Sequence, residues 1–429
     1  MKKKIYLIGL NLYSIILALK IRKDFKNIDI NILEASGNFL NAYSSVKIKG
    51  YKCNPGFHAL EDIRSKNLIS LFSKILKLKK IKKTRGILIG KNLISYTDQY
   101  SKWPLTLKKN FKLFEKKINI KPNQIKKKID NKYLTYLKNN IIDDRISVSK
   151  NISLLYPWFF SPNYKINYYD EGFVFNQKIR DKRLKHSFVF PKNGLFESIS
   201  VALKKLLKKK NITVNLKTPI SFEKKNKNEI LFHGNSELNE KESIKILCIP
   251  VVPLTRCIKN FKKKLPKLEP IKYFTGLMEI KNLKKNILDK FSEIIVSSEE
   301  APGLRRISLF SEITGLKKKI YQYEFSEHNS IKDVKKQVIK INQLMSKFII
   351  LQSNNNKKLK FVNIGYAFIR NFFSPNQNDI KKISDETVEF FKNEKNFLFP
   401  RQITWPINSN KHMIYANEDY NNVIKKNLK

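Results

Sequence analysis

The chain has 429 residues, a formal net charge of +50, and 41% hydrophobic and 12% aromatic residues. This hydrophobic content is enough to build a core and excludes an intrinsically disordered chain, while the length favours two domains or one large discontinuous domain. The lysines are spread over the whole sequence and accompany many Asn, Ile and Phe residues. We therefore interpret the charge as a codon bias and expect no specific nucleic-acid partner.

The first predicted elements lie within residues 5–34. A basic start, MKKK, followed by an apolar run has the form of a secretion signal. However, no small-x-small cleavage site follows, and the run is shorter than the roughly 20 apolar residues of a membrane span. We favour the alternative of a buried strand over 5–8, a helix with Leu12, Ile15 and Ile16 on one face, and a second strand ending at Glu34.

The middle of the chain changes pattern twice. Residues 63–189 are rich in aromatic side chains and poor in strand signals, so we expect an inserted helical region there. A turn at Lys192-Asn193-Gly194 precedes an amphipathic helix that begins near Leu195. Residues 211–234 then alternate as a meander of short strands, and residues 244–258 predict an apolar strand, a turn and a helix.

The last third of the chain combines several strand-like runs with two helices, near 331–347 and 379–393, and a final helix. Cys53, Cys248 and Cys257 form no CxxC pair, and their odd number argues against a disulfide framework. The five histidines have no metal-ligand spacing. We therefore expect a reduced, metal-free cytoplasmic protein without a transmembrane segment.

The turn Gly9-Leu10-Asn11-Leu12-Tyr13-Ser14 has the spacing of a dinucleotide-binding loop. In such a loop, backbone N–H groups at a helix N-terminus bind pyrophosphate, and an acidic residue about 20 residues further on binds a ribose hydroxyl. Gly9 keeps the first glycine. Asn11 replaces the second and is expected to tolerate a positive φ, while Ser14 is small enough to replace the third. Glu34 is either the ribose ligand, which its spacing favours, or an ordinary carboxylate at a strand end.

The stretch ILEASGNFLNAYSSVKIKGYKCNPGFHAL, residues 32–60, resembles the second signature of flavin enzymes related to UDP-galactopyranose mutase, protoporphyrinogen oxidase and the amine oxidases. FPKNGLFESISVALKKLL, APGLRRISLFSE and YANEDYNNVI resemble later segments of the same superfamily. Leu40-Asn41-Ala42 stands where the superfamily has Gly-Gly-Arg, and Lys411-His412 stands where a Gly-Arg pair is expected. The resemblance implies FAD as the cofactor.

The resemblance also assigns residues by position. Gly56 and His58 would lie beside the isoalloxazine ring, and the alternative for His58 is an ordinary turn histidine. Asn417 and Asp419 would hold the N-terminus of the last helix against the flavin, or would simply cap that helix.

A substrate site is implied by the motif that contains Arg305 and Arg306. These residues would bind an acidic group of the substrate in a bidentate manner. The alternative, slightly favoured from the residues alone, is a solvated strand face.

These observations predict an α/β fold with a Rossmann-like, FAD/NAD(P)-binding parallel sheet that is discontinuous in sequence, an inserted helical region and a mixed-sheet substrate domain. The expected ranges are 1–62, 190–260 and 396–429 for the FAD-binding domain, 63–189 for the insertion, and 261–395 for the substrate domain. The implied function is an FAD-dependent oxidoreductase or mutase-like flavoprotein acting on a small metabolite, such as a sugar nucleotide or an amine. The alternative is a non-catalytic descendant of this fold that binds a ligand or partner without FAD.

Overall fold

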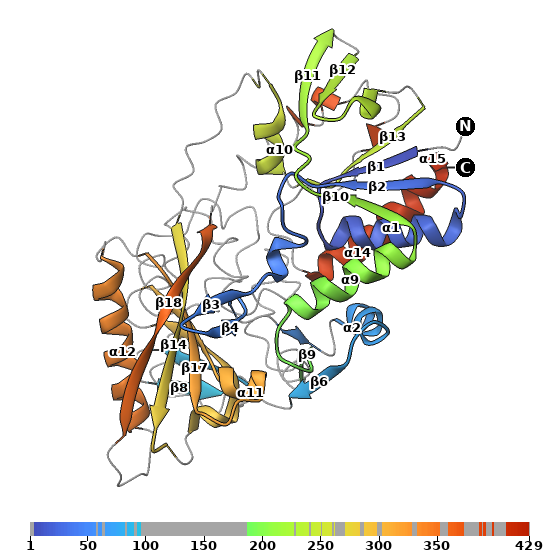
Figure 1. The fold of residues 1–429 in the computed structure, drawn as a ribbon. Helices are drawn as coiled ribbons and strands as arrows, with labels where there is room; N and C mark the ends of the chain where they lie inside the picture. The colour runs from blue at the N-terminus through green and yellow to red at the C-terminus, as the bar shows by residue number, and fades with distance from the viewer. Residues whose placement is uncertain are drawn as a thin grey trace, which may run out of the picture.

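The described chain is organised around two main sheets, with a small hairpin between them (Figure 1). The computed structural model describes residues 4–56, 59–61, 65–81, 84–89, 92–95, 187–226, 229–239, 242–249, 251–259, 261, 271–283, 287–297, 303–327, 333–351, 359–372, 386–387, 389–391, 397–398 and 409–428.

The first sheet is parallel and has five strands in the order β10-β2-β1-β13-β19. Counted along the chain this is the order 3-2-1-4-5 of the doubly wound dinucleotide-binding sheets. Its strands come from three distant parts of the sequence: β1 (Lys4–Ile8), β2 (Asp29–Leu33), β10 (Ile212–Asn215), β13 (Ile244–Leu247) and β19 (Phe397–Leu398).

Both faces of the parallel sheet are covered, because successive side chains of each strand point to opposite faces. Ile5 and Leu7 of β1 belong to a core that contains apolar side chains of helices α1, α9 and α14. Tyr6 and Ile8 belong to a second core with the β11–β12 hairpin and α10. This explains the wholly apolar run at 5–8. The covering elements are α1 (Leu12–Asp24), α9 (Glu197–Lys209), α14 (Ser409–Asp419), β11 (Ser221–Asn226), β12 (Glu229–His233) and α10 (Val251–Cys257).

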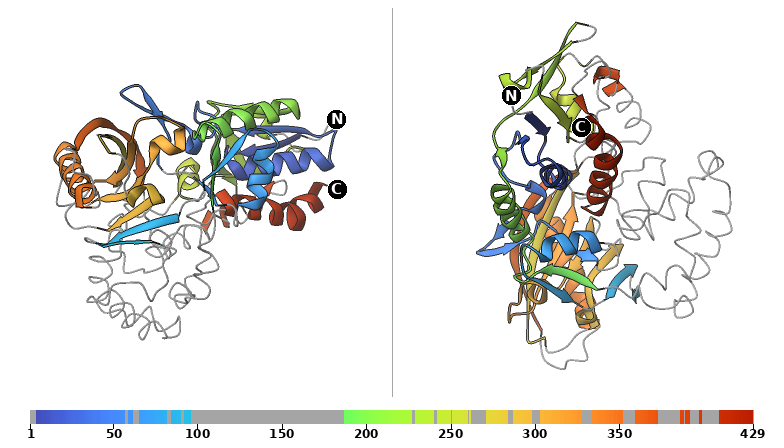
Figure 2. Two further views of the ribbon diagram at one scale, coloured as in Figure 1. Left: turned by 90° about the horizontal axis from the view of Figure 1, so that it is seen from below. Right: turned by 90° about the vertical axis from the view of Figure 1, so that its right-hand side faces the viewer.

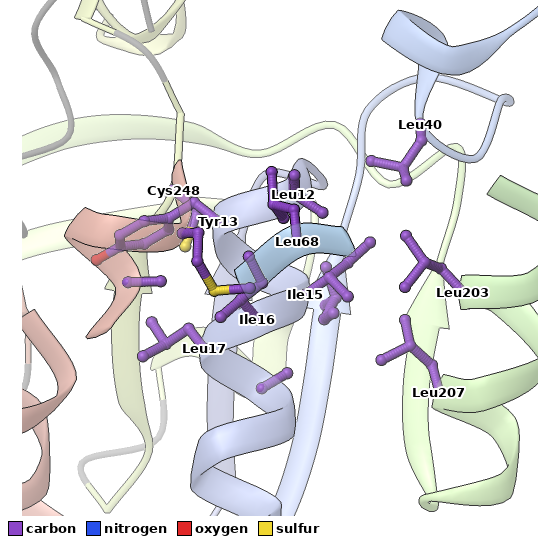
Figure 3. Packing of buried hydrophobic residues seen from close by; sticks show 14 of the residues in the cluster. Leu12, Tyr13, Ile15, Ile16, Leu17, Leu40, Leu68, Leu203, Leu207 and Cys248 are labelled. Carbon is purple, nitrogen blue, oxygen red and sulfur yellow. The ribbon is translucent and has the colours of Figure 1, made fainter. Parts of the chain in front are cut away.

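Helix α1 is buried on more than the one face that its apolar spacing predicts. Ile15 and Ile16 are buried as expected, but Tyr13 and Leu17 are buried as well. The reason is that α14 packs along α1. Figure 3 shows Tyr13 and Leu17 on the side of α1 nearest the last helix, and Ile15 on the side nearest α9.

The second sheet has seven strands in the order β18-β14-β17-β16-β15-β7-β8. The β15–β7 pairing is parallel and the others are antiparallel, so the sheet is mixed, as predicted. Helix α12 packs on one face, against Tyr321, Tyr323 and Phe325. The elements are β18 (Lys360–Phe372), β14 (Ile271–Lys281), β17 (Ile320–Ser326), β16 (Leu304–Ser308), β15 (Phe291–Ser297), β7 (Thr84–Ile89), β8 (Asn92–Ser95), α11 (Phe310–Thr314) and α12 (Val334–Leu351).

The hairpin of β3 (Val46–Ile48) and β4 (Tyr51–Cys53) lies between the two sheets (Figures 1 and 2). Its apolar side packs on the mixed sheet, where Cys53 meets Leu277. On the other side, Lys52 forms an ion pair with Glu197 of α9 at 2.7 Å. The hairpin therefore connects the mixed sheet to a helix of the parallel sheet.

The range predicted as an inserted helical region, 63–189, differs from that prediction in its first part. After α2 (Lys66–Ser73), the chain forms β6 (Leu78–Ile81), which pairs with β9 (Phe188–Pro191), and β9 pairs on its other side with β5 (Leu60–Glu61). Strands β7 and β8 then pair as a hairpin at the edge of the mixed sheet. The sequence pattern that predicts this hairpin is GILIGKNLIS, in which two apolar runs are separated by Gly-Lys. Residues 96–186 lie outside the described residues.

The two ends of the described chain lie close together beside the parallel sheet (Figures 1 and 2). Helix α14 continues through a π-helical turn, Tyr420–Ile424, into α15 (Lys425–Leu428). Asp24 at the end of α1 accepts a hydrogen bond from the Tyr420 hydroxyl at 2.7 Å and pairs with Lys425 at 2.8 Å. No helix among the described residues has the length and hydropathy needed to span a membrane.

Candidate cofactor site

The turn after β1 keeps the geometry of a dinucleotide-binding loop at its first glycine. Gly9 has a φ of +106° and donates its N–H to the Leu33 carbonyl at 2.8 Å. A Cβ at this position would lie 2.9 Å from Ile249 Cγ1, so both the backbone conformation and the available space favour glycine. The turn lies where the strand order reverses between β1 and β13. In doubly wound sheets, ligands bind at this switch point.

Glu34 follows β2 directly, and the fold brings its carboxylate to the Gly9 turn. Oε2 accepts the Leu10 N–H at 2.9 Å, and Oε1 accepts the Ser36 N–H at 2.8 Å. These bonds fix the carboxylate in position. Because an ionised carboxylate has about four acceptor sites, it keeps capacity for ribose hydroxyls. The assignment of Glu34 as a ribose ligand stays a prediction, and its position is compatible with that role.

Asn11 and Ser14 form a reciprocal capping box at the start of α1. The Asn11 Oδ1 accepts the Ser14 N–H at 3.0 Å, and the Ser14 Oγ accepts the Asn11 N–H at 3.0 Å. Asn11 has a φ of −149°, so the tolerance of asparagine for a positive φ is not what places it here. It is an extended N-cap residue, and the side-chain oxygen rather than the backbone conformation explains its presence.

Asn11 also spans the switch point. Its Nδ2 donates to the Cys248 carbonyl at 2.5 Å, just beyond the end of β13. Ser14 is fully buried, which agrees with the expected close packing at the third glycine position. The two replacements of glycine therefore act together and occupy hydrogen-bonding groups at the N-terminus of α1.

Leu40, which stands where the flavin-enzyme motif that this stretch resembles has glycine, keeps a glycine-like backbone. Its φ is +52°, in the left-handed region that leucine rarely adopts. Its side chain is buried in the core of the parallel-sheet domain, on the side of Leu203 and Leu207 of α9 (Figure 3). The side chain therefore turns into the protein. Asn41 beside it is exposed.

Gly56 lies at the junction of the two sheets. Its φ is +147°, and a Cβ here would lie 3.0 Å from Glu324 Oε2 of the mixed sheet. Two residues earlier, Asn54 is 5% exposed and makes three hydrogen bonds, with the segment 194–196 and with β17. Its Nδ2 donates to the Gly194 carbonyl, its Oδ1 accepts the Phe196 N–H, both at 2.9 Å, and its carbonyl accepts from Gln322 Nε2 at 2.7 Å. His58 lies outside the described residues.

The face of the mixed sheet that meets this turn carries buried polar side chains. Glu324 accepts a hydrogen bond from the Tyr273 hydroxyl at 3.0 Å, and Gln322 donates to Thr275 Oγ1 at 2.8 Å. All these side chains are buried. Burying polar groups costs free energy unless they are paired, so such a face is typical of a site that binds a polar ligand.

Arg306 is bonded to buried carboxylates on this face. Its guanidinium lies 3.3 Å from Glu293 Oε2 and 3.7 Å from Glu324 Oε1, and its side chain is 13% exposed. The alternative of a solvated strand face is therefore wrong for Arg306. Its assignment to an acidic substrate group stays a prediction, and these two carboxylates compete for the same guanidinium. The backbone of Arg305 lies in β16, and its side chain lies outside the description.

Asn417 and Asp419 do not lie at the N-terminus of the last helix. Helix α14 begins at Ser409, so the prediction that these residues cap it is wrong. Asp419 is 2% exposed and accepts a hydrogen bond from the Tyr13 hydroxyl of α1 at 3.0 Å. Asn and Asp are common N-cap residues, and this is why the YANEDY motif predicts a helix start. In the structure the helix begins about two turns before these residues. Their assignment as cofactor residues stays a prediction.

The described residues offer no alternative metal or thiol chemistry at this site. They contain no group of three or more His, Cys, Asp and Glu side chains that could hold a metal ion. Burial raises the pKa of the Cys248 thiol well above its ordinary range, and the nearby Asp419 raises it further. A protonated thiol is a poor nucleophile, so Cys248 acts here as a buried core residue.

Sequence reasoning missed the polar side chains of the mixed sheet. The run IYQYEF is one of the strand-like runs in the last third of the chain, and its alternation of polar and aromatic residues is typical of a strand with one solvated face. In the structure all seven residues of β17 are buried. The alternation was therefore a usable signal for Gln322 and Glu324, but nothing local distinguishes a solvated face from one covered by another domain.

No protein-family model matches this chain, and no curated protein matches its sequence. Among solved structures, it is similar to a reduced UDP-galactopyranose mutase, with 14% identity over 99% of this chain and 96% of that chain and a TM-score of 0.65. It is also similar to a candidate protoporphyrinogen oxidase from Exiguobacterium sp. 255-15, with 11% identity over 99% of both chains and a TM-score of 0.58. A putrescine oxidase bound to putrescine matches with 11% identity over 99% of both chains and a TM-score of 0.54.

The predicted fold class is confirmed. The parallel sheet with its helices and the separate mixed sheet form an architecture that these enzymes share along nearly their whole length. The resemblance inferred from the short motifs is thereby confirmed at the level of the fold. At these identities the likeness concerns the fold alone.

Proposed function

We propose that this protein is an FAD-dependent flavoprotein, an oxidoreductase or mutase, that acts on a small metabolite such as a sugar nucleotide or an amine. The observation that carries the proposal is the joint geometry of Gly9 and Glu34. A glycine turn with a positive φ and a strand-end carboxylate meet at the switch point of a parallel sheet, where dinucleotides bind.

The residues of the turn fit a dinucleotide in two respects. The Gly9 turn has no Cβ to block close approach of the backbone, and the Glu34 carboxylate keeps acceptor capacity. The N–H groups of Leu12 and Tyr13, at the first two positions of α1, point out of the helix N-terminus. These groups would hold the ribose and the pyrophosphate. The flavin would supply the redox chemistry.

The substrate would lie against the polar face of the mixed sheet, next to Gly56. Tyr273, Gln322 and Glu324 offer hydroxyl, amide and carboxylate groups there. These side chains would orient the substrate and replace the water that its polar groups lose. In this proposal residues 1–62, 190–260 and 396–429 form the FAD-binding part, and residues 261–395 with strands β7 and β8 form the substrate part. The insertion is the range 63–189 without these two strands.

A visible absorption spectrum of the purified protein tests the proposal. We expect flavin absorbance, either as purified or after incubation with excess FAD and removal of the unbound part. Glu34→Ala should weaken FAD binding by about 1.5–3 kcal/mol, the contribution of a hydrogen bond to a charged group. Glu223→Ala is the matched control, because Glu223 lies in the β11–β12 hairpin and pairs with Lys259 at 3.1 Å.

Two results would contradict the proposal in different ways. A colourless protein that gains no flavin absorbance with excess FAD would favour the non-catalytic alternative. If the protein is yellow and the Glu34→Ala variant binds FAD as tightly as wild type, the result would support the flavoprotein function and contradict the role of Glu34 as a ligand.

A further inference from the structure

The capping box at the start of α1 occupies groups that a bound pyrophosphate would use. The superfamily's loop has glycine at the positions of Asn11 and Ser14, and glycine has no side chain that can bond the helix N-terminus. Here the N–H of Asn11 and the N–H of Ser14 each bond the other residue's side-chain oxygen. The helix N-terminus is thus partly satisfied by the protein's own side chains.

Asn11 is held in this conformation by a second contact. Its Nδ2 donates to the Cys248 carbonyl at the end of β13, so the side chain lies across the switch point between β1 and β13. A phosphate group that approaches the N-terminus of α1 meets an amide that is bonded on both sides. Binding then requires that the amide move or that the phosphate use fewer donors.

We propose that Asn11, with Ser14, stabilises the cofactor-free protein and sets the affinity of this site for the pyrophosphate group, so that the dinucleotide is held weakly and exchanges readily. This inference rests on the proposed function. Thermodynamic linkage makes this inference testable. The free energy by which the capping box stabilises the cofactor-free protein is lost when a ligand displaces it, so it is subtracted from the binding free energy.

The test compares Asn11→Gly, Asn11→Asp and Ser14→Ala with the wild type. Asn11→Gly removes the competing side chain, so FAD should bind roughly tenfold more tightly while the thermal midpoint of the free protein falls by about 2 °C. Asn11→Asp keeps the N-cap acceptor but replaces the Nδ2 donor to the Cys248 carbonyl with an oxygen and adds negative charge, so the free protein should be less stable than wild type and FAD should bind roughly tenfold more weakly.

Ser14→Ala releases the Asn11 N–H and also removes the hydrogen bond that the Ser14 Oγ donates to the Asn11 carbonyl, while the Asn11 side chain stays in place, so an intermediate gain in affinity of roughly threefold is expected. A purely structural role for Asn11 predicts the opposite ranking, because a destabilised loop would bind FAD less well. Tighter binding of FAD by Asn11→Gly, in a free protein that is less stable than wild type, is therefore the diagnostic result.

ADP and adenosine identify the group that Asn11 opposes. The affinities for ADP and for adenosine are measured by calorimetry on the full chain, for wild type and Asn11→Gly. The gain in Asn11→Gly should appear with ADP, which carries the pyrophosphate, and should be absent with adenosine. An equal or lower affinity of Asn11→Gly for FAD and ADP would overturn the inference and leave the proposed function intact.

The remaining outcomes separate the two proposals. If Asn11→Gly gains affinity for ADP while no variant acquires flavin absorbance, the inference holds and the proposed flavoprotein function fails. If neither wild type nor any variant binds FAD or ADP, both fail together.

Discussion

The parallel sheet and the mixed sheet both contain strands that lie in a core, but the buried side chains of these strands differ in chemistry. In β1 the buried residues are Ile5, Tyr6, Leu7 and Ile8, whereas all seven residues of β17 are buried and include Gln322 and Glu324. The parallel sheet presents backbone groups at its strand ends to the candidate site. The mixed sheet presents polar side chains from the middle of its strands.

This difference indicates which part of a ligand each of the two sheets would bind. A dinucleotide phosphate is recognised well by backbone N–H groups, which any sequence can supply. A particular metabolite requires specific side chains, and these must be buried and paired to be tolerated. The stability of the mixed sheet therefore depends more strongly on individual polar residues. Substitutions in this sheet should lower the free energy of unfolding more than substitutions elsewhere.

The largest expected effect follows the removal of Arg306. Arg306→Ala leaves two buried carboxylates, Glu293 and Glu324, without this guanidinium, so the free energy of unfolding should fall by about 3–5 kcal/mol. Chemical denaturation measures the change. The triple variant Arg306→Met with Glu293→Gln and Glu324→Gln should lose much less, because it removes the guanidinium together with both carboxylate charges. A loss below about 1 kcal/mol in Arg306→Ala would show that the mixed sheet does not rely on this cluster.

A smaller effect is expected at the junction of the two sheets. Asn54→Asp replaces the donor to the Gly194 carbonyl with an acceptor in a buried position, and should cost about 1–3 kcal/mol. The matched control is Asn193→Asp in the same turn, where the side chain is exposed and bonds Ser198. Equal unfolding free energies for the two variants would contradict the role of Asn54 as a link between the sheets.

The smallest effect is a pH-dependent one between the hairpin and α9. Hydrogen bonds from Lys52 and then from Ser45 lower the pKa of Glu197. A carboxylate with a lowered pKa in the folded protein stabilises it above the ordinary glutamate pKa of about 4.3, and this contribution is lost as the pH falls through the folded value. Because the Glu197 side chain is 34% exposed, Glu197→Gln should cost at most about 1 kcal/mol at pH 7.

Denaturation at pH 7 and at about pH 3 checks the sign of this last effect. The two proteins should differ at neutral pH, and the difference should shrink as the pH falls through the lowered pKa of Glu197. A difference that is constant over the whole range would mean that the Lys52–Glu197 contact contributes through packing rather than through charge.

The sequence by itself determined the parts of the fold that depend on local patterns. The apolar run at 5–8, the period of the first helix, Gly9 and the spacing to Glu34 together predicted the parallel sheet and the turn that the structure contains. The order of the motif-like segments predicted the fold class. These features could be read because strand burial, helix period and glycine conformation leave a trace within a few residues.

Only the tertiary structure decided which partner each polar side chain has. The sequence alone did not show that Asn11 bonds Ser14 and Cys248, that Arg306 is bonded to Glu293 and Glu324, or that Asp419 lies inside a helix against Tyr13. The physical reason is that each of these contacts except the capping box joins residues far apart in the chain. A polar residue in an alternating strand has the same local pattern whether water or another domain covers it.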